Sequence, residues 1–404
     1  MITSNQKIIL KLLSNALSQS NRKLDAVSDW NAILDEASKQ CVFLIVYENA
    51  QDYIKRYLKA DELKKWNTRK IQLIRSSIKN AYQHNKLHNL LADNAVPYVI
   101  LKGQASAFYY PNPLLRTTGD VDFLVEKGSI EKVKELLLEE SYSMNPHNTS
   151  LCHLDFHKRN ELLEMHWEPN GIPNGEKGDL CRTYLQDAVS AAKLFEKDGL
   201  RLYLPDRLHH GFILLLHTAH HMINTGIGLR HLCDWAVFVN SVSDEEFITL
   251  FKDKLKSVGL WRFAQTLTQL CVHYLDCEYK KWADEDVDEE YLEKLLCDIF
   301  ESGNLGIKDP GRINEAKLMT TYSEGNITSD NMVKHLFKML SDKSKQELPI
   351  CKRFRILMPF GCLYISYRHL RRAIQGKRPK IHISKMVNGA NKRGQIYRQL
   401  KLFE

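Results

Sequence analysis

The 404-residue sequence contains no run of 18 or more apolar residues, so it predicts no transmembrane helix. Its first 15 residues carry one lysine before a short apolar stretch and no small-residue cleavage site, so we expect no signal peptide. The nine cysteines include no CxxC pair, which disfavours both a structural zinc site and a disulfide framework. These absences together predict a cytoplasmic protein with reduced thiols.

The composition is that of a soluble globular protein, with 44% hydrophobic and 26% charged residues. The length allows two or three domains and a substantial core. The net charge of +8 is unevenly distributed, because residues 351–404 contain 14 Lys or Arg and one acid. The preceding 350 residues then carry a net charge of −5, so we expect a mildly acidic body and a strongly basic tail.

The hydrophobic pattern divides the chain into four parts. Residues 1–95 place apolar side chains at helical intervals and contain no recognisable chemistry, which favours a packing subdomain. Residues 96–204 form the α+β core, with a small mixed sheet. Residues 205–350 form a larger all-helical domain that includes a loop or linker rich in Gly, Asn, Ser and Asp over 301–330. Residues 351–404 are the basic tail.

An acidic pair follows a glycine turn in the stretch PYVILKGQASAFYYPNPLLRTTGDVDFLV. An apolar strand ends at Gly103, a short helix covers 103–110, and TTGDVDFLV is a second strand that carries Asp120 and Asp122. Two carboxylates separated by one residue on a strand point to the same face, about 7 Å apart. This arrangement predicts a site for a divalent cation whose shell substrate phosphates complete.

Two alternating runs, SLCHLDFHK and ELLEMHWEP, predict a β-hairpin that turns at Arg159 and Asn160. With a two-residue loop the polar faces match, and the pairs are His157 with Leu162, Asp155 with Glu164, and His153 with His166. Carboxylates that face each other repel unless a cation or proton lies between them. We therefore expect Asp155 and Glu164 on one face, near the aspartate pair.

Four segments, LKG at 101–103, Arg116, GDVDFLV at 119–125 and LLEMHW at 162–167, resemble the polymerase-β-like nucleotidyltransferases. The resemblance is closest to the bacterial group of uncharacterised nucleotidyltransferases. Gly103 matches the helix-opening glycine of that superfamily, Asp120 and Asp122 match its acidic pair, and Glu164 matches its third acid. Gln104 stands where the superfamily prefers Gly or Ser, and the spacer to Asp120 is longer than usual.

The resemblance implies Mg²⁺-dependent transfer of a nucleoside monophosphate from an NTP to a hydroxyl of an unidentified acceptor, with release of pyrophosphate. Two Mg²⁺ ions would be held by Asp120, Asp122 and Glu164 as catalytic and metal-binding residues, with Glu164 alternatively acting as the base. The nucleotide would be bound by Lys102, Gly103, Gln104, Arg116 and His166, with backbone amides of the 103–110 helix on the phosphates. The acceptor could be a small molecule, a protein or RNA.

Several of these side chains have a second interpretation. Lys102 and Arg116 are equally consistent with surface residues. His166 could bind substrate, orient the acid on its strand, or satisfy a partner in the core.

A histidine-rich helix beginning at Pro205 carries His217, His220 and His221 at i, i+3 and i+4, with His209 and His210 two turns earlier. Such spacing can bind zinc, but the glutamate of an HExxH motif is missing. Packing against the core, or lining the acceptor pocket, is the favoured interpretation. We expect Asp234 to be a partner for one of these histidines.

The segment FRILMPFGCLYISYRHLRRAIQGKRPK interleaves aromatic and basic residues. It predicts either a membrane-surface or nucleic-acid partner, or a final helix that packs its apolar face and keeps a solvated basic rim. Two alternatives to the enzyme follow from the sequence. One is a catalytically silent nucleotide-binding module, which Gln104 leaves open, and the other is a nucleic-acid- or membrane-binding protein that acts through this tail.

Overall fold

The structure is a computed structural model. It describes residues 1–25, 27, 29–145, 150, 152–197, 199–284, 288–319, 337, 340–341, 344–345, 348, 350–351, 354–374 and 383–404.

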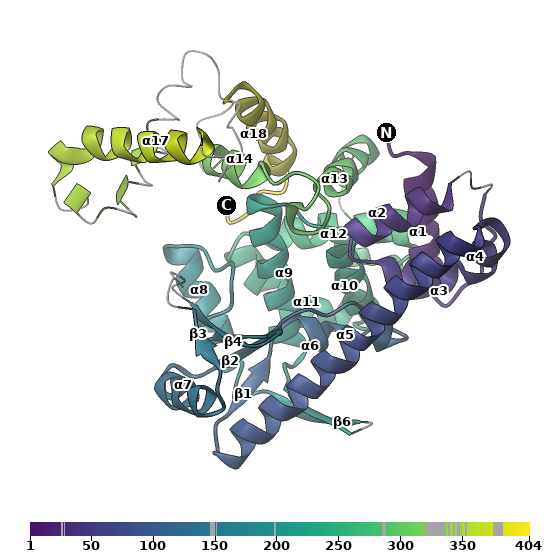
Figure 1. Cartoon of the computed structure of the whole chain (residues 1–404), viewed down its shortest axis with the longest axis horizontal. Coiled ribbons are helices and arrows are strands. Elements are labelled where there is room, and N and C mark those ends of the chain that lie inside the picture. Colours follow the sequence, from purple (N-terminus) through teal and green to yellow (C-terminus); the bar gives the residue numbers. More distant parts are fainter. Residues whose placement is uncertain are drawn as a thin grey trace.

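The N-terminal part is helical, as predicted. Its helices are α1 (Ser4–Leu17), α2 (Trp30–Lys39), α3 (Phe43–Asn49), α4 (Gln51–Tyr57) and α5 (Ala60–Asp93). Asp29 caps α2 by accepting a hydrogen bond from the amide of Ala32. The 34-residue helix α5 runs from this helical group to the strands of the core, where it packs against β2 (Val121–Val125) and β7 (Leu200–Leu204) (Figure 1). One continuous helix therefore joins the N-terminal part to the core.

The core holds a five-stranded mixed sheet, as predicted. Its strands are β1 (Tyr98–Ile100), β2 (Val121–Val125), β3 (Ser143–Met144), β4 (His153–Lys158) and β5 (Glu161–His166), in the order β1-β2-β5-β4-β3. Strands β2 and β5 are parallel, and the other pairs are antiparallel. The helices between them are α6 (Gly103–Ala107), α7 (Ile130–Glu139) and the 3₁₀ turns η1 (Pro113–Leu115) and η2 (Lys127–Ser129).

The predicted hairpin register is confirmed. Strands β4 and β5 pair His157 with Leu162, Asp155 with Glu164 and His153 with His166. Arg159 takes a φ of 53° at the two-residue turn. Because side chains alternate along each strand, this register places Asp155 and Glu164 on one face of the sheet, as expected.

The two faces of the sheet pack differently. Val121, Phe123 and Val125 point to one face, where α5 and α7 close a core with Leu87 and Val133 among its members. On the other face, Val99, Leu101 and Leu124 join the large core of the helical domain. Asp122 and Glu164 lie on this second face, where Asp122 is buried and Glu164 is partly exposed, its side chain 19% accessible.

Helix α8 (Glu176–Leu185) and a second hairpin, β6 (Lys193–Lys197) with β7 (Leu200–Leu204), complete the core. The C-terminal helices are α9 (Arg207–Asn224), α10 (Leu229–Asn240), α11 (Asp244–Ser257), α12 (Trp261–Leu275), α13 (Glu289–Ser302), α14 (Arg312–Met319), α17 (Met358–Ile374) and α18 (Ile383–Arg398), with the 3₁₀ turns η3 (Lys281–Ala283), η4 (Asn304–Gly306) and η6 (Arg355–Leu357). The predicted loop over 301–330 is wrong for Arg312–Met319, which form α14 because that helix packs on α18 and α9; residues 320–330 lie outside the described part of the chain.

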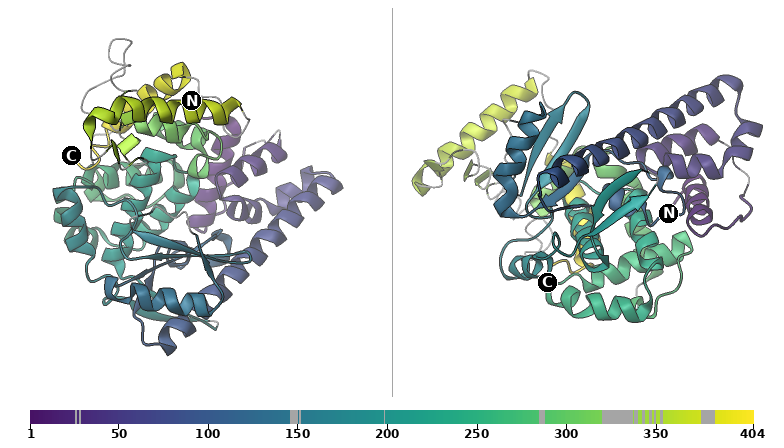
Figure 2. Two further views of the ribbon diagram at one scale, coloured as in Figure 1. Left: turned by 60° about the vertical axis from the view of Figure 1, so that its left-hand side comes forward. Right: turned by 90° about the horizontal axis from the view of Figure 1, so that it is seen from below.

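The basic tail divides into two helices with different surroundings. Helix α18 packs against α13 and α14, whereas α17 projects from the body in Figure 1 and in the right-hand view of Figure 2. Among the described residues, no helix has the length and apolar character needed to cross a membrane.

Candidate active site

Asp122, Glu164 and His166 lie together on two neighbouring parallel strands. The β2–β5 register sets Asp122 directly beside Glu164. Nε2 of His166 lies 3.1 Å from Oδ1 of Asp122 and 3.5 Å from Oε2 of Glu164. One ligand atom from each of the three residues lies within 4.8 Å of the others, a spacing that can hold a metal ion. The structure therefore unites two of the three predicted acids with the predicted His166.

Lys102 reaches this group from the turn between β1 and α6. Its Nζ lies 2.9 Å from Oδ1 of Asp122. The amide of Leu101 donates to the Asp122 carbonyl at 2.9 Å, which holds the turn against β2. Lys102 and Gly103 both have positive φ angles, of 34° and 43°, so the chain reverses sharply here. Sequence reasoning did not foresee that Lys102 would pair with Asp122 itself.

The charges in this group compensate one another. Burial favours the neutral form of Asp122, but Lys102 and His166 outweigh burial and hold its pKa well below the ordinary value. Burial also opposes a charge on His166, yet the hydrogen bonds with Asp122 and Glu164 raise its pKa to about 10. The His166 imidazole is therefore cationic at neutral pH, and it stands with Lys102 against two carboxylates.

Asp120 lies next to this group but outside it. Strand β2 begins at Val121, so the prediction that Asp120 is a strand residue is wrong, and Asn80 of α5 holds the carbonyl groups of Gly119 and Asp120 instead. The charge of Asp122, and then burial, raise the pKa of Asp120 above its ordinary value. Its role as a metal ligand stays a prediction.

The residues on the β4 side were only partly foreseen. Asp155 faces Glu164 as expected, and its Oδ1 lies 3.3 Å from Nε2 of His153. Sequence reasoning missed Cys152, whose Sγ lies 3.6 Å from Nδ1 of His153. Burial would raise the pKa of this thiol, but hydrogen bonds with His153 and His166 outweigh burial and lower it to about 6. Cys152 precedes β4, so strand alternation did not mark it.

Arg116 forms a buried ion pair rather than a surface side chain. Its Nε and Nη2 lie 2.9 and 2.6 Å from the two carboxylate oxygens of Asp234 on α10, and the Tyr110 hydroxyl donates to the same carboxylate at 2.7 Å. The expectation that Asp234 is a histidine partner is therefore wrong. The pair ties the loop before β2 to the helical domain, and a nucleotide role for Arg116 stays a prediction.

The predicted helix over 103–110 is shorter than expected, because α6 ends at Ala107. Gly103 has open space around the position of a Cβ atom, so its positive φ is what favours glycine there. Gln104 is buried in the first turn of α6. Whether these residues bind a nucleotide stays a prediction.

The histidines of α9 separate into two groups. His209 lies between two carboxylates, 2.8 Å from Asp206 and 3.1 Å from Asp187. His217, His220 and His221 instead lie close to one another near the other end of the helix. In the part of the chain that the structure describes, only Asp122, Glu164 and His166 bring three metal-ligating atoms together, so the zinc interpretation gains no support here.

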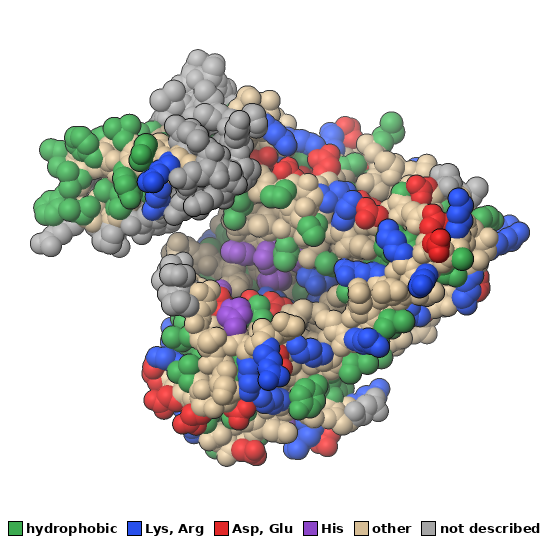
Figure 3. All heavy atoms as spheres, viewed as in Figure 1, with side chains coloured by type: hydrophobic (Ala, Val, Ile, Leu, Met, Phe, Trp, Pro, Cys, Tyr) green, Lys and Arg blue, Asp and Glu red, His purple; other side chains and the backbone are tan. Residues whose placement is uncertain are grey.

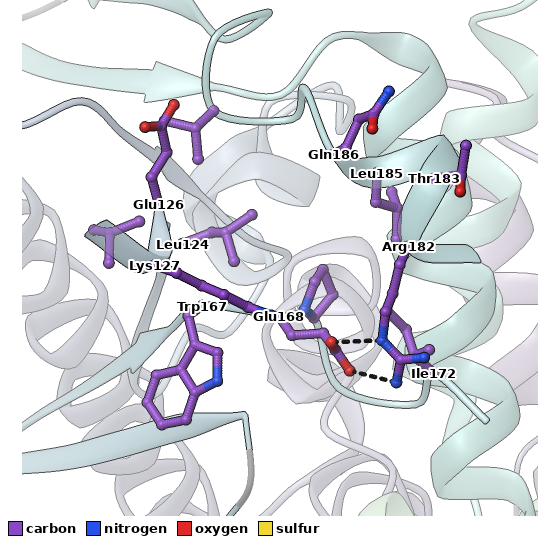
Figure 4. A pocket seen from close by; sticks show the side chains of 13 residues that line it. Leu124, Glu126, Lys127, Trp167, Glu168, Ile172, Arg182, Thr183, Leu185 and Gln186 are labelled. Carbon is purple, nitrogen blue, oxygen red and sulfur yellow. Dashed lines mark hydrogen bonds and ion pairs between the residues drawn. The ribbon is translucent and has the colours of Figure 1, made fainter. Parts of the chain in front are cut away.

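A separate pocket of about 450 Å³ lies beyond the carboxyl ends of β2 and β5 (Figure 4). Leu124 and Trp167 form part of its wall. Glu168 and Arg182 form a two-bond ion pair at its edge, with distances of 2.8 and 3.1 Å. None of the predicted site residues lines this pocket.

Comparison with protein families matches residues 26–276 to a family described as uncharacterised nucleotidyltransferase. A similar solved structure is that of an antigenic nucleotidyltransferase-like protein from Paracoccidioides brasiliensis. It shares 14% sequence identity, covers 51% of this chain and 95% of its own, and has a TM-score of 0.32. A comparison with curated proteins found no match.

Proposed function

The chain belongs to the family of uncharacterised nucleotidyltransferases, and we propose that it transfers a nucleoside monophosphate from an NTP to a hydroxyl of an acceptor, releasing pyrophosphate. The observation that carries this proposal is the parallel pairing of β2 with β5, which sets Asp122 beside Glu164 on the buried face of the sheet. The two carboxylates are far apart in the sequence, and the fold brings them together. Their proximity supports a function that uses both carboxylates, such as binding of a metal ion.

The residues present fit Mg²⁺. Asp122, Glu164 and the adjacent Asp120 offer the carboxylate oxygens that this cation prefers, and the ligand atoms of Asp122 and Glu164 lie within 4.8 Å of each other. When bound, Mg²⁺ would lower the pKa of the acceptor hydroxyl and neutralise charge on the pyrophosphate. His166 holds Asp122 in place through its 3.1 Å hydrogen bond, so it acts as a positioning residue for the acid.

Lys102 has two roles in this proposal. In the free protein its ammonium group balances the buried charge of Asp122 at 2.9 Å. With Asp122 holding Mg²⁺, the ammonium group would be free to contact phosphate oxygens of the NTP. The short helix α6 places the amides next to Gly103 near the same side chain, where they would donate hydrogen bonds to phosphate oxygens.

The proposal is tested by measuring the melting temperature with each of the four NTPs, with and without Mg²⁺, in the wild type and in Asp122→Asn. We expect at least one NTP to raise the melting temperature of the wild type only with Mg²⁺, and Asp122→Asn to lose this effect. Asp93→Asn, an isosteric change at the exposed end of α5, is the matched control. Absence of Mg²⁺-dependent stabilisation by any NTP would refute the enzyme. Stabilisation that persists without Mg²⁺ and in Asp122→Asn would indicate a nucleotide-binding module instead.

A further inference from the structure

Three histidines form a compact cluster where α9 meets α10. The rings of His217 and His221 lie 4.3 Å apart, and each lies 5.9 Å from the ring of His231. We call these three residues the histidine cluster. Figure 3 shows histidine side chains gathered in a hollow on this face of the molecule. The proposed function assigns no step to this cluster.

The cluster holds a buried hydrogen-bond donor without a protein partner. Nδ1 of His231 accepts the amide of Gly228 at 3.4 Å, so the neutral ring carries its proton on Nε2. His231 is 3% exposed, and its Nε2 has no partner within the described residues. An unpaired buried polar atom costs free energy, so its presence calls for a ligand that accepts a hydrogen bond.

The charges around the cluster are positive. Burial, followed by the charge of Lys102, holds the pKa of His217 well below its ordinary value. Burial and then Arg230 act in the same direction on His231. The rings are therefore neutral and can donate N–H groups, while the positive charges of Lys102 and Arg230 act on them.

The cluster borders the acidic site. Lys102, which pairs with Asp122, is also one of the cations acting on His217, His221 and His231. Nη1 of Arg230 lies 3.4 Å from the carbonyl oxygen of Thr117, in the loop before β2. The loop after β5 packs closely against α9 at Gly171. A Cβ atom at this position would lie 2.4 Å from the Leu216 carbonyl oxygen, so only glycine allows this approach.

We propose that His217, His221 and His231, together with Lys102 and Arg230, form a binding site for a phosphate group beside the acidic residues. Imidazole N–H donors would contact the phosphate oxygens, and the two cations would neutralise their charge. As a subsite for the NTP or for a phosphorylated acceptor, it rests on the proposed function. Phosphate binding by itself does not depend on that function.

Charge favours an anion over a metal ion at the cluster. A divalent cation would be repelled by Lys102 and Arg230, whereas a phosphate would be attracted. The acidic site shows the reverse arrangement, with oxygen ligands that converge. Zinc binding is therefore an outcome that would contradict the proposal.

The test measures binding of inorganic phosphate and pyrophosphate to the full chain without metal by isothermal titration calorimetry. We expect the double variant His217→Leu/His221→Leu to weaken binding at least about tenfold, since two of the donors are lost. Arg230→Gln, at a half-exposed side chain, is a second variant in case the double variant does not fold. His273→Leu, on the exposed face of α12, is the control. Unchanged binding in both variants, or tight Zn²⁺ binding that the double variant loses, would overturn the site.

Two further measurements show whether the bound phosphate belongs to the NTP or to the acceptor, and whether the phosphate site can be correct when the proposed function is not. If Mg²⁺-NTP binding weakens in parallel with phosphate binding, the site takes the triphosphate; if NTP binding is kept while phosphate binding is lost, the site takes an acceptor phosphate. Asp122→Asn should bind inorganic phosphate at least as tightly as the wild type, because it removes a negative charge and frees Lys102 from its ion pair. Phosphate binding in a protein that shows no Mg²⁺-dependent NTP binding would support the site and refute only the proposed function.

Helix α17 carries a second, independent feature. Phe360, Leu363, Tyr364 and Tyr367 occupy positions i, i+3, i+4 and i+7, and each is between 51% and 69% exposed. Met358, Cys362 and Ile365 on the opposite side are buried. The helix therefore presents an apolar stripe to solvent, which Figure 3 shows as a hydrophobic patch on the projecting arm.

Basic residues accompany this stripe. Residues 351–380 contain nine Lys or Arg and no Asp or Glu. Arg371 is exposed at the end of the stripe, and the Arg368 guanidinium lies 5.8 Å from the centre of the Tyr364 ring. We infer that α17 binds the surface of an anionic lipid bilayer, because an apolar stripe that carries tyrosines and is bordered by bases fits a headgroup layer. A nucleic acid would contact the Lys and Arg side chains and leave the apolar stripe exposed to solvent.

The test is sedimentation with vesicles of phosphatidylcholine alone or with about 30% phosphatidylglycerol, a content high enough to attract basic residues. We expect binding to the anionic vesicles only, and a loss of at least about tenfold in Phe360→Ser/Leu363→Ser, since two large apolar groups no longer enter the bilayer. Leu138→Ser, which replaces an exposed leucine on α7, is the control. Equal binding by the stripe variant, or a chain dimer or nucleic-acid complex that the same variant abolishes while vesicles are ignored, would contradict the inference.

Discussion

The acidic group on the sheet and the histidine cluster on α9 and α10 deal with buried polar atoms in opposite ways. At the acidic group, Asp122 is charged and has two cationic partners, Lys102 and His166. At the histidine cluster the rings are neutral, and Nε2 of His231 has no partner in the described chain. A buried charge is tolerated only when it is paired, whereas a neutral ring can remain unpaired at a smaller cost. The acidic group therefore suits a metal cation that takes the place of Lys102 and His166. The histidine cluster suits a ligand that accepts a hydrogen bond from the unpaired ring nitrogen.

The largest effect is expected at the acidic group. Asp122→Asn removes a buried carboxylate that would face the metal and the developing charge, so NTP-dependent pyrophosphate release should fall about a thousandfold or more. The measurement is pyrophosphate release with the acceptor or, without one, with water. Activity equal to that of Asp93→Asn would show that the acidic group is not the catalytic centre.

The second largest effect is expected for the buried ion pair between Arg116 and Asp234, which joins the loop before β2 to helix α10. Arg116→Met leaves Asp234 charged and without a cationic partner at 5% exposure, and should lower the free energy of unfolding by about 3–5 kcal/mol. The double variant Arg116→Met/Asp234→Leu should recover most of this loss, because neither charge remains buried. Urea denaturation of the three proteins measures the difference. Equal stability of the single and double variants would show that the carboxylate is not the source of the loss.

His210 lies two turns before the histidine cluster on α9 and is also a buried neutral ring. Its substitution tests how such a ring makes the free energy of unfolding depend on pH. Burial lowers its pKa to about 4, so the folded protein does not bind the proton that the unfolded chain binds below pH 6.5. Its contribution to stability is present above that pH and is lost as the pH falls towards 4, by up to about 3 kcal/mol. His210→Leu should therefore show a flatter decline of unfolding free energy between pH 6.5 and 4. A decline as steep as in the wild type would place the protonating groups elsewhere.

The smallest effect is expected at Lys102, which belongs to both regions. Lys102→Met removes a cation from the proposed phosphate positions and a partner from Asp122, so NTP affinity should fall about tenfold while Mg²⁺ affinity rises. Calorimetry with Mg²⁺ alone and with Mg²⁺-NTP separates the two. A decrease in Mg²⁺ affinity would contradict the balance of charge described for the acidic group.

The parts of the fold that local patterning specifies were predictable. Alternation around Arg159 and Asn160 determined the hairpin register, because only a two-residue turn matches the polar faces. The helical character of α1 to α5 and the cap at Asp29 also follow from local periodicity. The prediction of a loop over 301–330 was wrong at α14. The polar composition indicated a loop, but packing against α18 stabilises a helix there.

The candidate site was predictable as a set of residues but not as an arrangement. The sequence by itself determined that Asp122 points to one face of its strand and that Asp155 and Glu164 share one face of the hairpin, because side-chain direction is a property of each strand. Only the tertiary structure decided that β2 and β5 are parallel neighbours, that Asp234 pairs with Arg116 rather than a histidine, and that Lys102 pairs with Asp122. Strand order and helix docking depend on the whole core, and no local pattern along the chain records them.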